Sequence, residues 1–205
     1  MSHIRYATEI FDLQFILDHK AEVHLLKKLI FSLIGLTFNA SALDCNQVTE
    51  IPSTECEVLV TLYNSTNGDN WTDNNGWLET NTPCSWKGVT CSGGHVSELS
   101  LYYNNLSGSI PSELSNLNNL KSLYLYDNQL TGSIPSELGN LSNFTWLHLY
   151  SNSLTGLIPS ELGNLTHLTF LSLANSDLTG SIPTELGNLS NLTMLFLDGN
   201  QLGAN

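Results

Sequence analysis

Residues 96–119 read VSELSLYYNNLSGSIPSELSNLNN, and the same Leu, Asn, Gly, Ile and Pro slots return every 24 residues. The Ile-Pro pairs of this phrase fall at Ile110-Pro111, Ile134-Pro135, Ile158-Pro159 and Ile182-Pro183. A fixed period of this length is typical of a solenoid, in which one structural unit is stacked on copies of itself. Four units span 96–119, 120–143, 144–167 and 168–191, and a fifth, truncated unit covers 192–205.

Apolar residues fill seven slots of each unit, and we expect them to face inward. In the first unit they are Val96, Leu99, Leu101, Leu106, Ile110, Leu114 and Leu117. The opening Leu-x-x-Leu-x-Leu alternates with a period of two, which predicts one short parallel strand per unit. Function must therefore be sought in the slots whose residues vary.

The ninth slot holds an amide at Asn104, Asn128, Asn152 and Asn200. A buried amide can both donate to and accept from backbone groups that stacking leaves unpaired, so this column predicts an asparagine ladder. Ser176 occupies the slot in the fourth unit, and its shorter side chain predicts a locally weaker rung or a bridging water.

The phrase LxGxIPxxLGNLxx resembles the plant-type leucine-rich repeat of receptor-kinase ectodomains and polygalacturonase-inhibiting proteins. Residues 56–91 resemble the N-terminal cap of that family, and STNGDNW at 65–71 is similar to caps of microbial secreted proteins with the same repeat. The cap match rests on Pro83, Cys84, Trp86, Gly88, Val89 and Cys91. The resemblance implies an α/β solenoid, a right-handed superhelix with a parallel β-sheet on its concave face and a helical, disulfide-bonded N-terminal cap.

Three segments follow from these patterns: a leader (1–42), a cap (43–95) and the repeats (96–205). The apolar run Leu29–Phe38 follows two lysines and ends before Ala40-Ser41-Ala42, which predicts a secretory signal peptide cleaved before Leu43. Its length falls short of the about 20 residues that span a bilayer, and no other segment is long enough. Because residues 1–22 are acidic where a basic start belongs, one hypothesis is that translation begins near Val23 or Leu25. The competing interpretation is an uncleaved leader that anchors the protein.

All four cysteines lie in or just before the cap, which favours disulfides and an oxidising, secreted or cell-surface location. Three pairings can be drawn, and the short local loops favour Cys45–Cys56 with Cys84–Cys91. A zinc site is the alternative, although the paired C-x-x-C spacing is missing. In the same segment, Trp71, Trp77 and Trp86 are expected to shield the apolar edge of the first unit, with carbohydrate stacking as the alternative.

The net negative charge of residues 43–205 excludes several classes of binding partner. Residues 43–205 hold two lysines and no arginine against 15 Asp and Glu, a formal charge of −13. Nucleic acid and anionic lipid need a basic face, so neither is expected as a partner.

The sequence does not indicate catalytic activity or a metal site either. No catalytic motif is present, and we expect no enzyme activity, no cofactor and no metal. The polar loop with Asp69 and Asp73 fails the calcium-loop spacing.

The outward strand slots carry aromatic side chains, and we expect them to form a ligand-binding concave face. Strands lie about 4.8 Å apart, so Tyr102, Tyr126 and Tyr150 should stack. The competing interpretation is that tyrosines merely suit exposed strands. The candidate residues are Tyr102, Tyr124, Tyr126, Trp146, His148, Tyr150, Phe170 and Phe196.

The expected partner is a protein, peptide or glycan, and an inhibitor of polysaccharide-degrading enzymes is a narrower form of this prediction. The alternative from another class is a structural surface protein whose repeats act as spacers or self-associate through the uncapped C-terminal edge. A further alternative is a fragment of a larger receptor-like protein. A hydroxyl column at Ser107, Thr131, Thr155 and Thr179 could suit ice or a polysaccharide, but the slot belongs to the ordinary repeat and is interpreted as structural.

Overall fold

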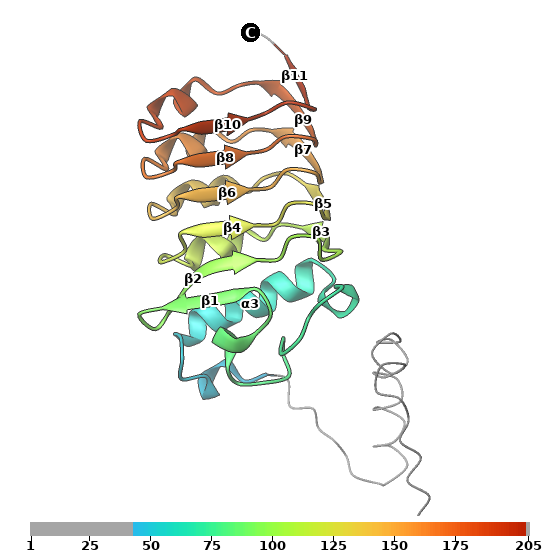
Figure 1. Cartoon of the computed structure of the whole chain (residues 1–205), viewed down its shortest axis with the longest axis vertical. Coiled ribbons are helices and arrows are strands. Elements are labelled where there is room, and N and C mark those ends of the chain that lie inside the picture. Colours follow the sequence, from blue (N-terminus) through green and yellow to red (C-terminus); the bar gives the residue numbers. More distant parts are fainter. Residues whose placement is uncertain (1–42, 204–205) are drawn as a thin grey trace, which may run out of the picture. The chain divides into compact units, whose positions relative to one another are not determined.

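The computed structural model describes residues 43–203, which form a stack of rungs on an N-terminal cap (Figure 1). The leader, its predicted signal peptide and the proposed cleavage site before Leu43 involve residues 1–42, which lie outside the described residues. The solenoid expected from the 24-residue period is confirmed.

The first sheet carries one strand from each rung and has the order β1-β2-β4-β6-β8-β10 (Figure 1). β1 pairs antiparallel with β2, and every later pair is parallel. Residues one repeat apart lie opposite each other, as Ser100 does to Tyr124 and Tyr124 to His148. The strands are β1 (Val89–Ser92), β2 (His95–Ser100), β4 (Ser122–Tyr124), β6 (Trp146–His148), β8 (Phe170–Ser172) and β10 (Met194–Phe196).

A second parallel sheet was not predicted. It forms from the Leu-x-Gly segment that follows each ladder slot, in the order β11-β9-β7-β5-β3. Once the chain has turned at the Asn, neighbouring segments run side by side and their backbone groups pair, as Thr131 does with Ser153. Its strands are β3 (Ser107–Ser109), β5 (Gln129–Gly132), β7 (Ser153–Leu157), β9 (Asp177–Ser181) and β11 (Gln201–Gly203).

A short 3-10 helix completes each full rung, and a proline with extended backbone precedes every one of them. These helices pack closely: a Cβ at Gly139 would collide with the carbonyl oxygen of Glu161 in the next rung. The helices are η4 (Ser112–Asn116), η5 (Ser136–Asn140), η6 (Ser160–Asn164) and η7 (Thr184–Asn188).

The core is the predicted set of inward slots. All seven apolar residues of the first unit are buried, and the equivalent residues of the second and third units are buried as well. At the C-terminal edge the inward-facing Leu195 is 43% exposed, because within the described residues no rung covers β10.

The cap covers the other end of the core and consists of η1 (Cys45–Gln47), α3 (Ser53–Ser65), η2 (Gly68–Asn70), η3 (Pro83–Ser85) and β1. Trp71, Trp77 and Trp86 are buried against it, with ring centroids of successive tryptophans 4.9 and 5.1 Å apart. The structural interpretation of these residues is therefore confirmed. The disulfides join Cys45 to Cys56 and Cys84 to Cys91, the pairing that the local loops favoured.

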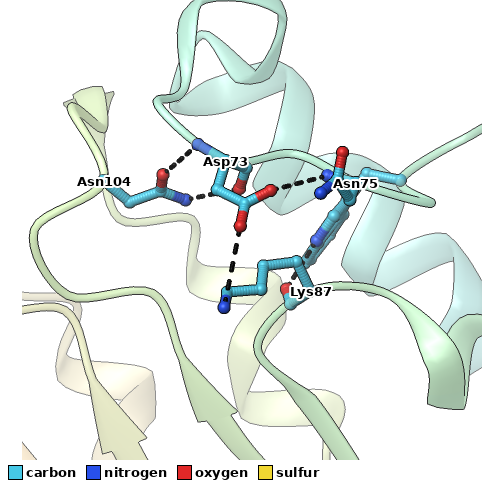
Figure 2. A network of polar contacts seen from close by, with 5 residues as sticks. Asp73, Asn75, Lys87 and Asn104 are labelled. Atoms are coloured by element: carbon cyan, nitrogen blue, oxygen red, sulfur yellow. Dashed lines mark hydrogen bonds and ion pairs between the residues drawn. The ribbon is translucent and has the colours of Figure 1, made fainter. Parts of the chain in front are cut away.

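Polar contacts fasten the cap to the first rung. The buried Glu55 carboxylate accepts from the Val96 backbone N–H at 2.8 Å and contacts Nδ1 of His95 at 2.7 Å. On the other side, the Asn104 side chain accepts from the Asp73 N–H at 2.6 Å and donates to the Asp73 carbonyl at 2.9 Å (Figure 2). The first ladder amide therefore binds the cap instead of a preceding rung.

The asparagine ladder is present. Asn128 donates to the carbonyls of Leu101 and Leu125, both at 2.9 Å, so one amide ties its own rung to the preceding one. Its Oδ1 accepts from the N–H groups of Asn104 and Leu106 at 3.0 and 2.9 Å. Asn152 and Asn200 repeat the pattern at their own levels.

The interruption at Ser176 has the expected consequence. Its hydroxyl is buried and has no hydrogen-bond partner within residues 43–203. By the pattern of the other rungs, an Asn here would donate to the carbonyls of Leu149 and Leu173 and accept from the N–H of Leu154. The third and fourth rungs are therefore joined by fewer bonds than their neighbours.

Replacing Asn128 or Ser176 by Ala should lower the free energy of unfolding by different amounts. Asn128→Ala should lower the free energy of unfolding by roughly 2 to 4 kcal/mol, because buried donors and acceptors lose their partner. Ser176→Ala removes a hydroxyl that bonds to nothing in residues 43–203 and should change stability by less than about 0.5 kcal/mol. Urea unfolding of both variants measures the difference, and equal losses would contradict the ladder account.

Candidate functional site

The outward slots of the first sheet form columns that run along the stack. In-register pairing sets Ser100, Tyr124, His148, Ser172 and Phe196 side by side in one column. A neighbouring column continues through backbone bonds from Tyr103 N to Tyr126 O, Asp127 N to Tyr150 O, Ser151 N to Ala174 O and Asn175 N to Asp198 O. It contains Tyr102, Tyr126, Tyr150, Ala174 and Asp198.

Tyr102, Tyr126 and Tyr150, which we call the tyrosine strip, stack as predicted. The ring centroids of Tyr102 and Tyr126 are 4.8 Å apart with planes 1° apart, and those of Tyr126 and Tyr150 are 4.6 Å and 9° apart. This distance matches the about 4.8 Å between strands, so the sheet imposes the stack. Inside the strip the ring faces cover each other, so the ring edges and hydroxyls are the parts left uncovered by the stack.

The other five candidates form an adjoining cluster, the aromatic patch, made of Tyr124, Trp146, His148, Phe170 and Phe196. Its centre is a parallel stack of His148 and Phe170 with centroids 4.1 Å apart. Trp146 and Phe196 lie 5.4 and 5.5 Å from the Phe170 ring. A contact of 6.0 Å between Tyr126 and His148 joins the patch to the strip, so all eight candidates lie together.

This combined aromatic face reaches solvent. Tyr102 is 47% exposed, Trp146 42% and Phe196 43%, while the remaining five are half-buried by their neighbours. A contiguous exposed group of large apolar side chains is typical of an interaction site.

His148 behaves as an apolar member of the patch. Its Nε2 is buried and has no hydrogen-bond partner among the described residues. Burial lowers the pKa of His148 below its ordinary value, so the ring is neutral at neutral pH. A charged imidazolium would lose hydration here without gaining a partner.

Two residues outside the candidate set belong to the face. The Tyr103 ring, 69% exposed, packs edge-on against Tyr102 at 6.2 Å and Tyr126 at 6.1 Å. Its hydroxyl donates to the Asp127 carboxylate, which raises the Tyr103 pKa. Both residues adopt a left-handed backbone, with φ of 50° and 53°. Tyr103 and Asp127 occupy the same slot of their rungs, directly before the ladder Asn. The strand alternation does not extend to this slot, so a search of alternate positions misses both residues.

Tyr126 and Tyr150 of the strip remain hydrogen-bond donors at neutral pH. Burial raises the pKa of Tyr126, with smaller contributions from Tyr150 and Tyr102 and from Asp127. Burial, followed by the Asp127 charge, raises the pKa of Tyr150 as well. The face therefore combines neutral aromatic surface with a fixed carboxylate.

A groove with a volume of about 380 Å³ separates the cap from the start of the tyrosine strip. Asp73 and Lys87 form an ion pair of 3.6 Å in its wall, and Asp73 also accepts from the Asn75 N–H at 3.3 Å (Figure 2). Its lining is Thr72, Asp73, Lys87, Gly88, Ser100, Leu101, Tyr102, Tyr103 and Asn104. Within residues 43–203 no group of three His, Cys, Asp or Glu side chains could hold a metal ion.

The hydroxyl column lies on the second sheet and takes part in the fold. Thr131 donates to the Gly108 carbonyl of the preceding rung at 3.2 Å, and Thr179 donates to that of Gly156 at 3.3 Å. These bonds support the structural interpretation of the column.

Comparisons place the repeats and cap among known proteins. Residues 92–204 match the leucine-rich repeat region family, and residues 52–92 match the leucine rich repeat N-terminal domain. A plant ice-binding protein aligns with a TM-score of 0.69 at 30% identity, over 75% of this chain and 50% of its own. The BIR2 ectodomain from Arabidopsis thaliana aligns with a TM-score of 0.68 at 30% identity, over 77% and 83%.

A third structure, the plant peptide hormone receptor RGFR1 in complex with RGF2, aligns with a TM-score of 0.55 at 44% identity. This alignment covers 59% of the present chain and 19% of the receptor. The chain thus spans half of the ice-binding protein and about a fifth of this receptor. The repeats and cap share an ectodomain-like fold with these plant receptors.

The burial of His148 predicts a pH dependence of stability. The unfolded chain protonates this residue near its ordinary pKa of about 6.5, whereas the folded protein does so only at lower pH. The stability that neutral His148 contributes is therefore complete above pH 6.5 and is lost as the pH falls toward the folded pKa.

His148→Phe should remove this loss, so its urea midpoint should fall less than that of the wild type between pH 7 and pH 5. Equal shifts in the two proteins would show that His148 does not titrate as described.

Proposed function

The chain belongs to the leucine-rich-repeat family, and on this basis we propose that it is a secreted or cell-surface binding module that recognises a peptide or protein through its aromatic face. The observation that carries the proposal is the continuous face of eight aromatic side chains, held by a rigid sheet and partly exposed. Aromatic side chains give large contact area at low entropic cost and are enriched among residues that dominate binding energy.

A peptide or protein suits this face better than a glycan. Sugar rings stack on open aromatic faces, whereas the rings inside the tyrosine strip cover each other at 4.6 and 4.8 Å. What they present outward are edges and hydroxyls, which match the carbonyls and side chains of a polypeptide. The similar plant peptide hormone receptor, solved in complex with RGF2, is consistent with this choice.

The proposed location rests on the cap. Its two disulfides require an oxidising compartment, and the ectodomain-like fold agrees with an extracellular or cell-surface site. No helix within residues 43–203 combines the length and apolar character needed to cross a membrane. We propose no catalytic role and no cofactor for the module.

Binding to a display library of 12-residue peptides tests the proposal. A Tyr102→Ala/Tyr126→Ala/Tyr150→Ala variant should weaken binding of the selected peptides at least about tenfold, since central aromatic residues each contribute 1 kcal/mol or more at such surfaces. A matched variant on the second sheet, Thr131→Ala/Thr155→Ala/Thr179→Ala, should bind as the wild type does.

Both variants are first checked for an unchanged circular dichroism spectrum. Selected peptides that bind the tyrosine variant as tightly as the wild type, or a protein that captures glycans and no peptide, would refute the proposal. No ligand of any kind would favour the spacer alternative.

A further inference from the structure

The groove between the cap and the first rung adjoins the tyrosine strip. Its volume is about 380 Å³, and it is lined by Tyr102, the first ring of the strip, which is 47% exposed. Ser100 and Lys87 line the same groove, together with the cap residues Thr72 and Asp73. A ligand that follows the tyrosine strip toward the cap therefore reaches this groove.

The cap loop fixes the shape of the groove. The Asn104 side chain accepts from the Asp73 N–H at 2.6 Å and donates to the Asp73 carbonyl at 2.9 Å (Figure 2). The Thr72 N–H donates to the Asn104 carbonyl at 3.0 Å. Because these three bonds tie the cap loop to the first rung, the groove is ordered before a ligand arrives, and binding there costs little conformational entropy.

Two charged side chains line the groove, Lys87 and Asp73. Their charged atoms are 3.6 Å apart, and the Lys87 side chain is 56% exposed against 34% for Asp73. An ion pair of this length in contact with solvent is weak. The Lys87 ammonium can therefore bind a second negative group without a large loss elsewhere.

The unused hydrogen-bonding capacity of the groove lies in donors. The Asp73 carboxylate already accepts from the Asn75 N–H at 3.3 Å and pairs with Lys87 (Figure 2). The Lys87 ammonium has three N–H donors, and Asp73 is its one partner within residues 43–203. The hydroxyls of Ser100 and Tyr102 have no hydrogen-bond partner among the described residues. A group that brings several acceptor sites and a negative charge, such as a carboxylate, matches this set.

The rest of the aromatic face repels such a group. Its outward slots hold three charged side chains, all acidic: Glu98, Asp127 and Asp198. The second lysine of residues 43–205, Lys121, directly precedes β4, at the opposite end of this strand from Tyr126. A carboxylate is therefore attracted at the cap end of the tyrosine strip and repelled farther along the face, which gives a bound peptide one preferred direction.

We propose that this groove binds a carboxylate of the partner peptide, which pairs with the Lys87 ammonium and accepts from the hydroxyls of Ser100 and Tyr102. The remainder of the peptide extends from the groove along the tyrosine strip. The carboxylate belongs either to the C-terminus of the peptide or to an Asp or Glu side chain, and the chemistry is the same. This inference rests on the proposed function and adds to it the group that is recognised and the orientation of the ligand.

The test uses the full secreted protein and a library of 12-residue peptides displayed with a free carboxyl end. Each selected peptide is synthesised in its native form, with an amidated C-terminus, and with each Asp or Glu replaced by Asn or Gln. One of these neutral replacements should weaken binding about tenfold, the loss of one charge-assisted contact. Loss on amidation identifies the terminal carboxylate, and loss on side-chain replacement identifies Asp or Glu.

Three variants assign the effect to the groove. In Lys87→Gln the same neutral replacement should change binding less than about twofold. Lys121→Gln removes an equal charge away from the groove and should keep the tenfold effect. Lys87→Arg should keep it as well, because guanidinium also pairs with carboxylates. The thermal unfolding midpoint of each variant should remain within a few degrees of the wild type.

Two results would overturn the inference and leave the proposed function intact. In the first, peptides that require the tyrosine strip bind equally well after every carboxylate has been neutralised. In the second, the tenfold effect persists in Lys87→Gln or disappears in Lys121→Gln. A protein that captures no peptide would overturn both proposals.

Discussion

The buried amide at the ninth slot is the interaction on which the rest of the molecule depends. Each short strand exposes apolar residues and unpaired backbone on both edges, so a single rung cannot be stable by itself. Asn128 and Asn152 bond to carbonyls of their own rung and of the preceding one, and this fixes the spacing and register of the stack. Asn104 performs the same task toward the cap through Asp73.

The spacing that the ladder enforces also organises the aromatic face. In-register parallel strands place the same slot of neighbouring rungs about 4.8 Å apart. This spacing is close to the separation at which aromatic rings stack. Tyr102, Tyr126 and Tyr150 therefore stack without any further device. His148 instead stacks diagonally on Phe170, which occupies a different slot of the next rung. Rigidity matters for recognition, because a surface ordered before binding loses little entropy when a ligand arrives.

Sequence reasoning reached the features that repeat and missed those that depend on contacts between different slots. The inward leucines, the ladder and the stacking of three tyrosines all follow from a period of 24 residues, and the buried tryptophans follow from the need to cover the first rung. The second sheet could not be predicted in this way, because strands of three to five residues such as Ser107–Ser109 carry no alternation strong enough to recognise. The Glu55 bond to Val96 joins residues with no shared pattern, and only the folded backbone brings them together. Tyr103 and Asp127 do share the slot before the ladder Asn, but that slot lies beyond the alternating strand positions.

The central claim is that ligands meet the aromatic face, and side-chain NMR tests it most directly. Titrating a library-selected peptide into protein labelled at its aromatic side chains should shift the signals of Tyr126, His148, Tyr150 and Phe170. The buried cap tryptophans should stay unchanged and serve as an internal reference. Shifts confined to residues outside the outward columns of the first sheet, with the tyrosine strip unaffected, would contradict the account.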